Sequence, residues 1–314
     1  MAEAAVAGQP ARRPSIRLLP LLMLLALGAL WGANPTFSKA LAQVGVGPFG
    51  VVFWQTAVAG CILLGVCILR RVRIPLDRKA IAYYVFIGSI GTALSYATIV
   101  FVIGHVSAGY VSVLIVLSPL LTYLFAIVVR LETINLLRAI GILLGLVGAA
   151  ILVVPHGSLP SPEALPYALV ALVIPAGYAA ANVYAEWGRP DKSENVALAT
   201  GTMFAAAAAM ALLGLVNGSF HPAWNAPFDS QLLLLAYGAA TAIAFMLFYT
   251  IVSRDGAVYL GQVGYLVTLA GIAWGMLFFG ETHSDWLWLA VVVVFAGVAL
   301  VNFGKRRATG KSAA

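Results

Sequence analysis

The chain has 314 residues, of which 62% are hydrophobic and only 9% charged, and its mean hydropathy is +0.99. Soluble domains are about 45–50% apolar and about 25% charged, so the composition excludes a disordered chain, a disulfide scaffold and an ordinary soluble enzyme. The net charge of +7 fits the Lys and Arg excess of cytoplasmic loops better than a nucleic-acid partner, and we interpret the chain as an integral membrane protein.

Apolar runs separated by charged residues or by Gly and Pro predict ten transmembrane helices and hence an all-α fold. Each run is close to the ~20 residues that cross a bilayer. In chain order the predicted helices span about residues 18–41, 48–69, 80–103, 107–129, 135–154, 164–186, 195–216, 230–252, 258–279 and 285–303. The first run follows three arginines as a signal peptide would, but it is too long for one, so we expect an uncleaved span.

The positive charges indicate the orientation of these helices. Under this topology both tails and the loops after helices 2, 4, 6 and 8 lie on one side, and they contain all 18 Lys and Arg residues except Lys39. The positive-inside rule therefore places both termini in the cytoplasm, and we expect a bacterial inner-membrane protein. Lys39, late in helix 1 on the outer side, either reaches the interface or steers an anionic group.

The sequence also repeats itself at a spacing of 148–149 residues. The repeated positions include Glu132-Thr133 and Glu281-Thr282, Ala33-Asn34 and Ala181-Asn182, Thr92 and Thr241, and Tyr96 and Phe245. Five spans per half, an odd number, require the second half to enter the membrane from the opposite side. An inverted repeat is typical of secondary transporters with a substrate site near the midplane, although an old duplication kept for packing is an alternative.

The predicted parts are accordingly a cytoplasmic tail (1–17), a five-helix repeat (18–154), an external linker (155–163), a second five-helix repeat (164–303) and a basic tail (304–314). Several motifs resemble one known family: Leu30-Trp31-Gly32-Ala33-Asn34, Ser118-Pro119-Leu120, Glu132-Thr133 and Glu281-Thr282. With two five-helix halves they are similar to the EamA-type carriers of the drug/metabolite transporter superfamily, over about residues 18–303. The resemblance implies a central cavity lined by helices 1, 3, 4, 6, 8 and 9, and similar bacterial carriers export amino acids, including aromatic ones.

Polar residues within the predicted spans are candidate functional groups, because unsatisfied polar groups are costly in hydrocarbon. No Asp or Glu lies in the interior of a predicted span, so we expect transport without a buried carboxylate. Asn34 and Asn182 occupy matching positions and suit an amino or carboxylate group, or an interhelical hydrogen bond. Pro35, Pro119 and Pro175 predict kinks that free backbone carbonyls.

Aromatic side chains with polar tips form a second set of candidates. Trp31 and Asn34 share one helix face, and Gln262 lies three residues from both Tyr259 and Tyr265. Such a wall suits a flat or cationic substrate, although Tyr and Trp also form interfacial belts. The predicted cavity comprises Trp31, Asn34, Thr92, Tyr96, Tyr110, Ser118, Tyr178, Asn182, Phe245, Tyr259, Gln262 and Tyr265, with Tyr249 as a further aromatic candidate.

These features predict a carrier that exports small neutral or zwitterionic metabolites, amino acids first, by facilitative alternating access. Efflux of flat cationic drugs by proton antiport is the alternative, and an intramembrane enzyme would need a His, Asp or Glu that the spans lack. We expect no metal or cofactor, because the histidines share no metal-ligand spacing, and no disulfide, because Cys61 and Cys67 point apart on one helix. The expected partners are a small-molecule substrate and the lipid bilayer, and we expect no nucleic-acid partner. We expect the chain to be a monomer or a weak homodimer. The histidines are His105, His156, His221 and His283.

Overall fold

The computed structural model describes residues 18–42, 46–102, 105, 114–153, 163, 165–218, 220, 227–279, 289, 292–293, 295–301 and 303–304. In this part of the chain the regular structure is entirely helical, which confirms the all-α class. Seven helical stretches are long and apolar enough to cross a membrane, and two shorter apolar helices cover residues 114–128 and 136–148. The chain is therefore a multi-pass membrane protein.

The described helices follow the predicted spans closely. They are α1 (Leu18–Gly32), α2 (Asn34–Ala42), α3 (Pro48–Leu69), α4 (Arg78–Phe86), the π-helix η1 (Ile87–Leu94), α5 (Ser95–Val102), α7 (Ser118–Val128), α8 (Leu136–Val153), α9 (Leu165–Val170), α10 (Val173–Trp187), α11 (Asn195–Val216), α12 (Phe228–Asp255), α13 (Ala257–Gly261) and α14 (Val263–Phe279). Residues 295–301 are also helical. The count of ten stays a prediction, because residues 106–113 and 280–288 lie outside the described chain.

Local chemistry explains where several of these helices begin. Asp77 caps α4, since its carboxylate accepts hydrogen bonds from the backbone N–H groups of Lys79 and Ala80 at 3.0 and 3.2 Å. Gly256 separates α12 from α13 with φ +86° and ψ 165°, a conformation that essentially only glycine adopts. The connection at Gly256 therefore depends on the residue type as well as on its position.

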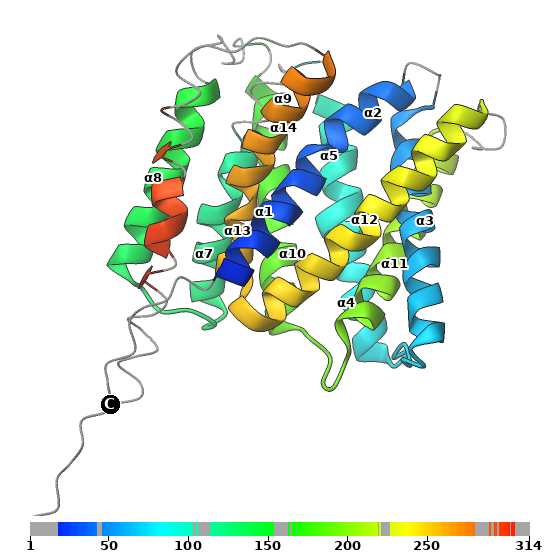
Figure 1. Ribbon diagram of the computed structural model, residues 1–314, viewed down its shortest axis with the longest axis horizontal. Helices are drawn as coiled ribbons and strands as arrows, with labels where there is room; N and C mark the ends of the chain where they lie inside the picture. The colour runs from blue at the N-terminus through cyan, green and yellow to red at the C-terminus, as the bar shows by residue number, and fades with distance from the viewer. Residues whose placement is uncertain are drawn as a thin grey trace, which may run out of the picture.

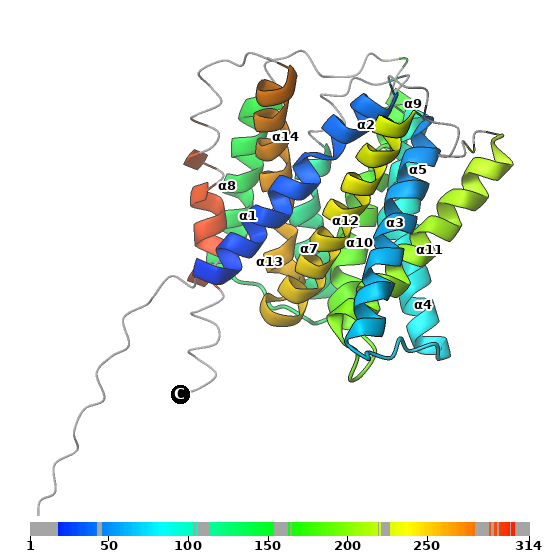
Figure 2. The same ribbon diagram turned by 45° about the vertical axis from the view of Figure 1, so that its right-hand side comes forward.

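The helices stand side by side, and their connections fall at two ends, called here the lower and upper ends as drawn in Figure 1. The connections that follow α3, α7, α10 and α12 all lie at the lower end, where α1 also begins. The sequence analysis assigns these same connections to one side. Figures 1 and 2 also show that α1 rises from the lower end, whereas α9 and α10 descend from the upper end.

Helix pairing links the two halves of the chain. The most extensive contact joins α3 to α11. Around it, α1 packs against α14 and α12, while α10 packs against α7 and η1. Close approach at the α1–α14 contact needs glycine, because a Cβ on Gly28 or on Gly32 would lie 2.6 Å from the Cβ of Leu266 or Ala270, respectively.

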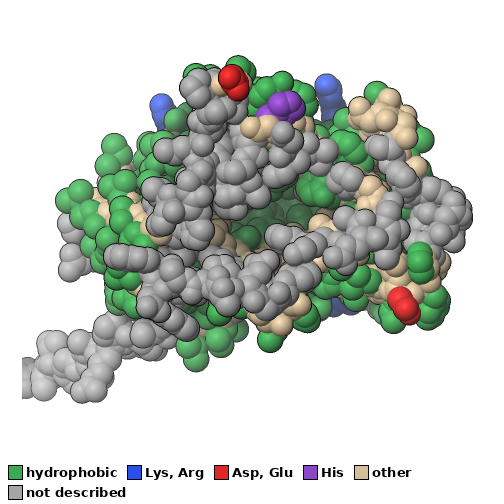
Figure 3. Space-filling model, turned by 90° about the horizontal axis from the view of Figure 1, so that it is seen from above, with side chains coloured by type: hydrophobic (Ala, Val, Ile, Leu, Met, Phe, Trp, Pro, Cys, Tyr) green, Lys and Arg blue, Asp and Glu red, His purple; other side chains and the backbone are tan. Residues whose placement is uncertain are grey.

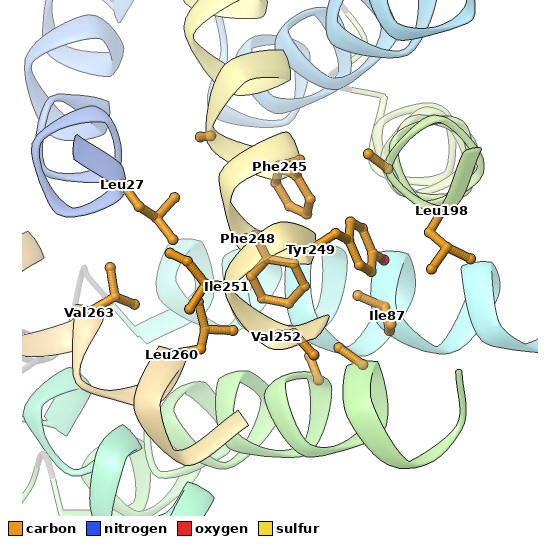
Figure 4. Packing of buried hydrophobic residues seen from close by; sticks show 14 of the residues in the cluster. Leu27, Ile87, Leu198, Phe245, Phe248, Tyr249, Ile251, Val252, Leu260 and Val263 are labelled. Carbon is orange, nitrogen blue, oxygen red and sulfur yellow. The ribbon is translucent and has the colours of Figure 1, made fainter. Parts of the chain in front are cut away.

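The largest buried cluster centres on α12, which contributes Phe245, Phe248, Tyr249 and Val252 (Figure 4). Side chains from α1, η1, α11, α13 and α14 surround them, so the core lies between the halves. Both cysteines of α3 are free, with Cys61 exposed and Cys67 buried.

Candidate functional site

Breaks in the helices mark the inner part of the bundle. Regular helix is interrupted at Ala33 between α1 and α2, at Leu117 before α7, at 171–172 between α9 and α10, and at Gln262 between α13 and α14. The third predicted span contains the π-helix η1 instead of a break, whereas α12 continues unbroken. Irregular backbone at membrane depth is tolerated where it is buried in protein or lines a cavity, and π-helical turns are frequent at functional sites.

Prolines account for three of these breaks. Pro35, Pro119 and Pro175 each lie within four residues after a break. Proline has no backbone N–H, and its ring clashes with the carbonyl of the fourth residue before it, so the preceding turn cannot stay regular. Pro119 and Pro175 are buried, and both therefore lie inside the bundle.

A buried polar network connects α7 to α10. The Asn182 Nδ2 donates a hydrogen bond of 3.3 Å to Thr122 Oγ1, and the Thr122 hydroxyl donates one of 2.8 Å to the carbonyl of Ser118. Asn182, Thr122 and Ser118 are 7%, 0% and 4% exposed, respectively. We call these three residues the Asn182 network. Sequence reasoning missed Thr122, because nothing in the sequence shows which helix Asn182 faces.

Helix α13 brings Gln262 close to the Asn182 network. A Cβ on Gly261 would lie only 3.3 Å from the side chain of Thr122, so α13 and α7 are in direct contact. Gln262 is fully buried, and its Nε2 donates to the carbonyl of Val258 at 3.3 Å. Within the described chain its Oε1 has no hydrogen-bond partner. The carboxamide oxygen is therefore a buried acceptor that finds no donor among the described residues.

A row of aromatic rings crosses the bundle from α1 through α12 to α4. Trp31 contacts Phe245 and Phe248 at centroid distances of 6.0 and 5.9 Å, and Phe248 contacts Tyr249 at 5.0 Å. Tyr249 continues to Tyr83 at 6.2 Å. We call these five residues the aromatic chain. Trp31, Phe245 and Tyr249 are predicted candidates, whereas Tyr83 and Phe248 are not, because an apolar helix pattern does not separate buried aromatic rings from interfacial ones.

A second aromatic group lies nearer the upper end. Tyr96 of α5 and Tyr237 of α12 both lie next to the side chain of Ser38, and Tyr237 also neighbours Gln55 of α3. Tyr178 of α10 lies close to Tyr96. Gln55 is 8% exposed, and its Oε1 has no hydrogen-bond partner among the described residues. The structure thus joins the predicted Tyr96 and Tyr178 to three polar residues that the sequence analysis does not single out.

Other predicted residues lie apart from these groups. Tyr265 is fully buried, and its hydroxyl donates to the carbonyl of Ile142 at 2.9 Å, so it packs against α8 rather than on the Asn182 network. Tyr259 is buried in α13, and Thr92 and Asn34 are half-buried in η1 and at the start of α2. Tyr110, Glu281-Thr282 and the histidines other than His105 lie outside the described residues, as do the side chains of Pro35 and Lys39. The His105 ring stacks on the Tyr167 ring, with 3.6 Å between the ring centroids.

The two ends of the bundle differ in shape and contacts. Seen from above, the molecule is hollowed near its centre, and hydrophobic side chains form the visible floor (Figure 3). At the lower end, Glu186 of α10 accepts a hydrogen bond of 2.6 Å from the backbone N–H of Ala257, at the start of α13. The Tyr83 hydroxyl donates to the carbonyl of Ala185 at 2.8 Å. These contacts close the lower end between α4, α10 and α13.

Comparison with known proteins shows that the sequence is similar to described transporters. Residues 18–154 match the model of the EamA-like transporter family. The chain is 24% identical over 286 residues, 90% of each sequence, to a protein of Bacillus subtilis described as the uncharacterized transporter YvbV. It also resembles a solved crystal structure whose description names no function, with a TM-score of 0.77 and 20% identity over 93% of this chain and 99% of the other. This last similarity shows the fold alone.

Proposed function

We propose that the chain is a membrane transporter of the EamA type that exports small neutral or zwitterionic metabolites, amino acids first, by alternating access. The match of residues 18–154 and the similarity to a described transporter support the class. The substrate, the direction of export and the mechanism rest on the arguments below. In this proposal the lower end faces the bacterial cytoplasm, because the connections rich in Lys and Arg gather there.

The observation that carries the proposal is the convergence of broken helices on the Asn182 network. Asn182 belongs to α10 and Gln262 to the break before α14, both in the second half, while Thr122 belongs to α7 in the first. Interrupted helices that meet between two repeats near the membrane midplane are typical of substrate sites in secondary transporters.

The helix pairing supports two inverted halves. The proposed two-fold relation matches α1 with α9–α10, α3 with α11, and α7 with α13–α14. It therefore exchanges the α1–α14 contact with the α10–α7 contact, and it maps the α3–α11 contact onto itself. Opposite directions of α1 and α10 agree with inversion (Figure 1). Two equivalent halves can exchange conformations, which is the basis of alternating access.

The hollow upper end and the closed lower end match the outward-facing state of such a cycle. Reaching the inward-facing state would require α10 to separate from α13 and α4, and hence the loss of the Glu186–Ala257 and Tyr83–Ala185 hydrogen bonds. Both bonds are interhelical bonds of the kind that contribute about 0.6–2 kcal/mol in membranes. They are weak enough for a transport cycle to break.

Two buried carboxamide oxygens favour a substrate with N–H groups. The Oε1 atoms of Gln55 and Gln262 are buried acceptors without a donor in the described chain. An unsatisfied buried acceptor costs about 1–3 kcal/mol, which an amino or ammonium donor would recover. Neither side chain bears a charge, so a zwitterion suits these two acceptors better than a fixed cation, whose charge would need a counter-ion. Facilitative transport follows from the absence of Asp and Glu from the predicted span interiors.

The test is uptake by proteoliposomes that contain the purified protein, with labelled phenylalanine, threonine and a flat aromatic cation. We expect saturable equilibration of at least one amino acid without an ion or pH gradient, and no such flux in empty liposomes. Cation flux that appears only under a pH gradient would favour drug antiport instead. No saturable flux of any probe in correctly folded protein would contradict the proposed substrate class.

A further inference from the structure

A pocket of about 460 Å³ opens between α3, α11 and α12, apart from the Asn182 network. Its lining includes Arg70, Arg189, Ser193, Asn195, Thr250 and Ser253. Arg70 follows the last residue of α3, and Asn195 is the first residue of α11, which places the pocket at the lower end of the bundle. It is thus a polar site at the level where the helices meet the charged connections.

Two arginines make the pocket positive. Arg70 is exposed, and Arg189 is half-buried in the connection between α10 and α11. The Arg189 Nη2 donates to the Ser193 carbonyl at 2.9 Å and to Asn195 Oδ1 at 2.6 Å. Within the described residues its Nη1 is buried without a hydrogen-bond partner, so the guanidinium keeps donor capacity. Glu194 also lines the pocket, but it is one acidic group against two basic ones.

The rest of the lining holds Arg189 in place and adds polar groups. The Asn195 Nδ2 donates to Thr250 Oγ1 at 3.4 Å and to Ser253 Oγ at 3.3 Å, which ties α11 to α12. The side chain of Glu194 makes no capping hydrogen bond to the first turn of α11. Backbone N–H groups at the start of a helix attract negative charge, and here they lie beside both arginines.

We propose that this pocket binds a phosphate-type anion, either the headgroup of an anionic phospholipid or free phosphate. The planar guanidinium fork of arginine matches phosphate oxygens, and basic pockets between transmembrane helices are typical sites for anionic headgroups. A bound anion would contact α3 of the first half and α11 and α12 of the second. It would therefore hold the halves together at their closed end, independently of which substrate the protein transports.

The test measures thermal unfolding of the full-length protein in neutral detergent. One arm adds phosphatidylglycerol, with phosphatidylcholine as its control, and the other adds inorganic phosphate, with chloride at equal ionic strength. We expect phosphatidylglycerol to raise the unfolding temperature more than phosphatidylcholine does, because a ligand that binds only the folded state stabilises it. A similar effect of inorganic phosphate would show that the phosphate group suffices, and its absence would identify the lipid as the ligand.

Variants make the inference specific to this pocket. R70A removes an exposed side chain and should weaken the apparent affinity about fivefold, corresponding to about 1 kcal/mol for one basic residue at an anionic surface. R189K keeps the charge but loses the fork, and it should also weaken binding. R78A, an exposed arginine that does not line the pocket, is the matched control and should bind as the wild type does.

Two outcomes would overturn the inference. One is the absence of stabilisation by either phosphatidylglycerol or phosphate. The other is equal weakening by R70A and R78A, since the binding would then reflect general surface charge. If R189K fails to fold, R70A still decides the question, because the Arg70 side chain is exposed and makes no hydrogen bond or ion pair among the described residues.

Discussion

Replacing Asn182 by alanine separates a role in transport from a role in packing. The substitution removes one interhelical hydrogen bond, the 3.3 Å bond to Thr122. Thr122 keeps its own bond to the Ser118 carbonyl, so no donor is stranded. Interhelical hydrogen bonds in membrane proteins average about 0.6 kcal/mol and reach about 1.7 kcal/mol. We therefore expect N182A to lower the free energy of unfolding by about 1 kcal/mol.

Transport should respond more strongly than stability does. If the Asn182 amide binds an amino or carboxylate group of the substrate, the loss of a hydrogen bond to a charged group costs about 1.5–3 kcal/mol. Initial uptake at low substrate concentration should then fall about 10- to 100-fold, since about 1.4 kcal/mol corresponds to a factor of ten. The measurements are initial uptake rates in proteoliposomes and unfolding in mixed micelles, on the same preparation.

A matched control is available at the upper end of the bundle, where α11 ends (Figure 2). Asn217 is exposed at the end of α11, and within the described residues its Nδ2 bonds only to the carbonyl of Leu213. N217A should leave both uptake and stability close to the wild-type values. Normal uptake by N182A, whatever its stability, would refute the assignment of Asn182 to the substrate site.

Three further variants each test one structural feature: an ion pair, a buried acceptor and a glycine conformation. R138M should lower the free energy of unfolding by about 2–4 kcal/mol, because it leaves Glu132 without its buried ion-pair partner; a quarter of the Glu132 side chain is exposed, which limits the loss. Q262L should leave stability unchanged or raise it slightly, since it removes a buried acceptor that has no partner among the described residues, while uptake falls; unchanged uptake would argue against a role for this oxygen. G256A should destabilise the protein by about 1–3 kcal/mol, because only glycine readily adopts φ +86° and ψ 165°, and an unchanged thermal midpoint would show that the connection adapts.

The membrane-spanning segments and the proline breaks could be predicted from the sequence because both depend on local chemistry. A run of about 20 apolar residues is stable only across a bilayer, and proline disrupts the turn before it wherever it lies. Where the predicted spans fall on described residues, they agree with the helices to within a few residues, and Pro35, Pro119 and Pro175 follow three of the breaks. The gathering of the charged connections at one end also agrees with the charge pattern (Figure 1).

Whether a given side chain points toward lipid, toward the core or toward a cavity could not be predicted in the same way. A helix that is apolar all round carries no stripe to distinguish lipid, core and cavity faces. Tyr265 has the same spacing from Gln262 as Tyr259 has, yet it packs on α8 and bonds to Ile142. Thr122 and Gln55 are unremarkable in sequence, and they matter because α10 and α12 bring Asn182 and Tyr237 beside them.

The sequence alone thus determined that the chain spans a membrane many times, where the described helices lie and where three of them break, because hydrophobicity and backbone geometry act over short stretches. Only the tertiary structure decided which polar groups meet inside the membrane. It joined Asn182 to Thr122, left the Gln262 oxygen without a donor among the described residues, and placed Arg70 and Arg189 on the lining of one pocket. These pairings depend on the rotation and approach of whole helices, which are set by packing between residues far apart in the chain.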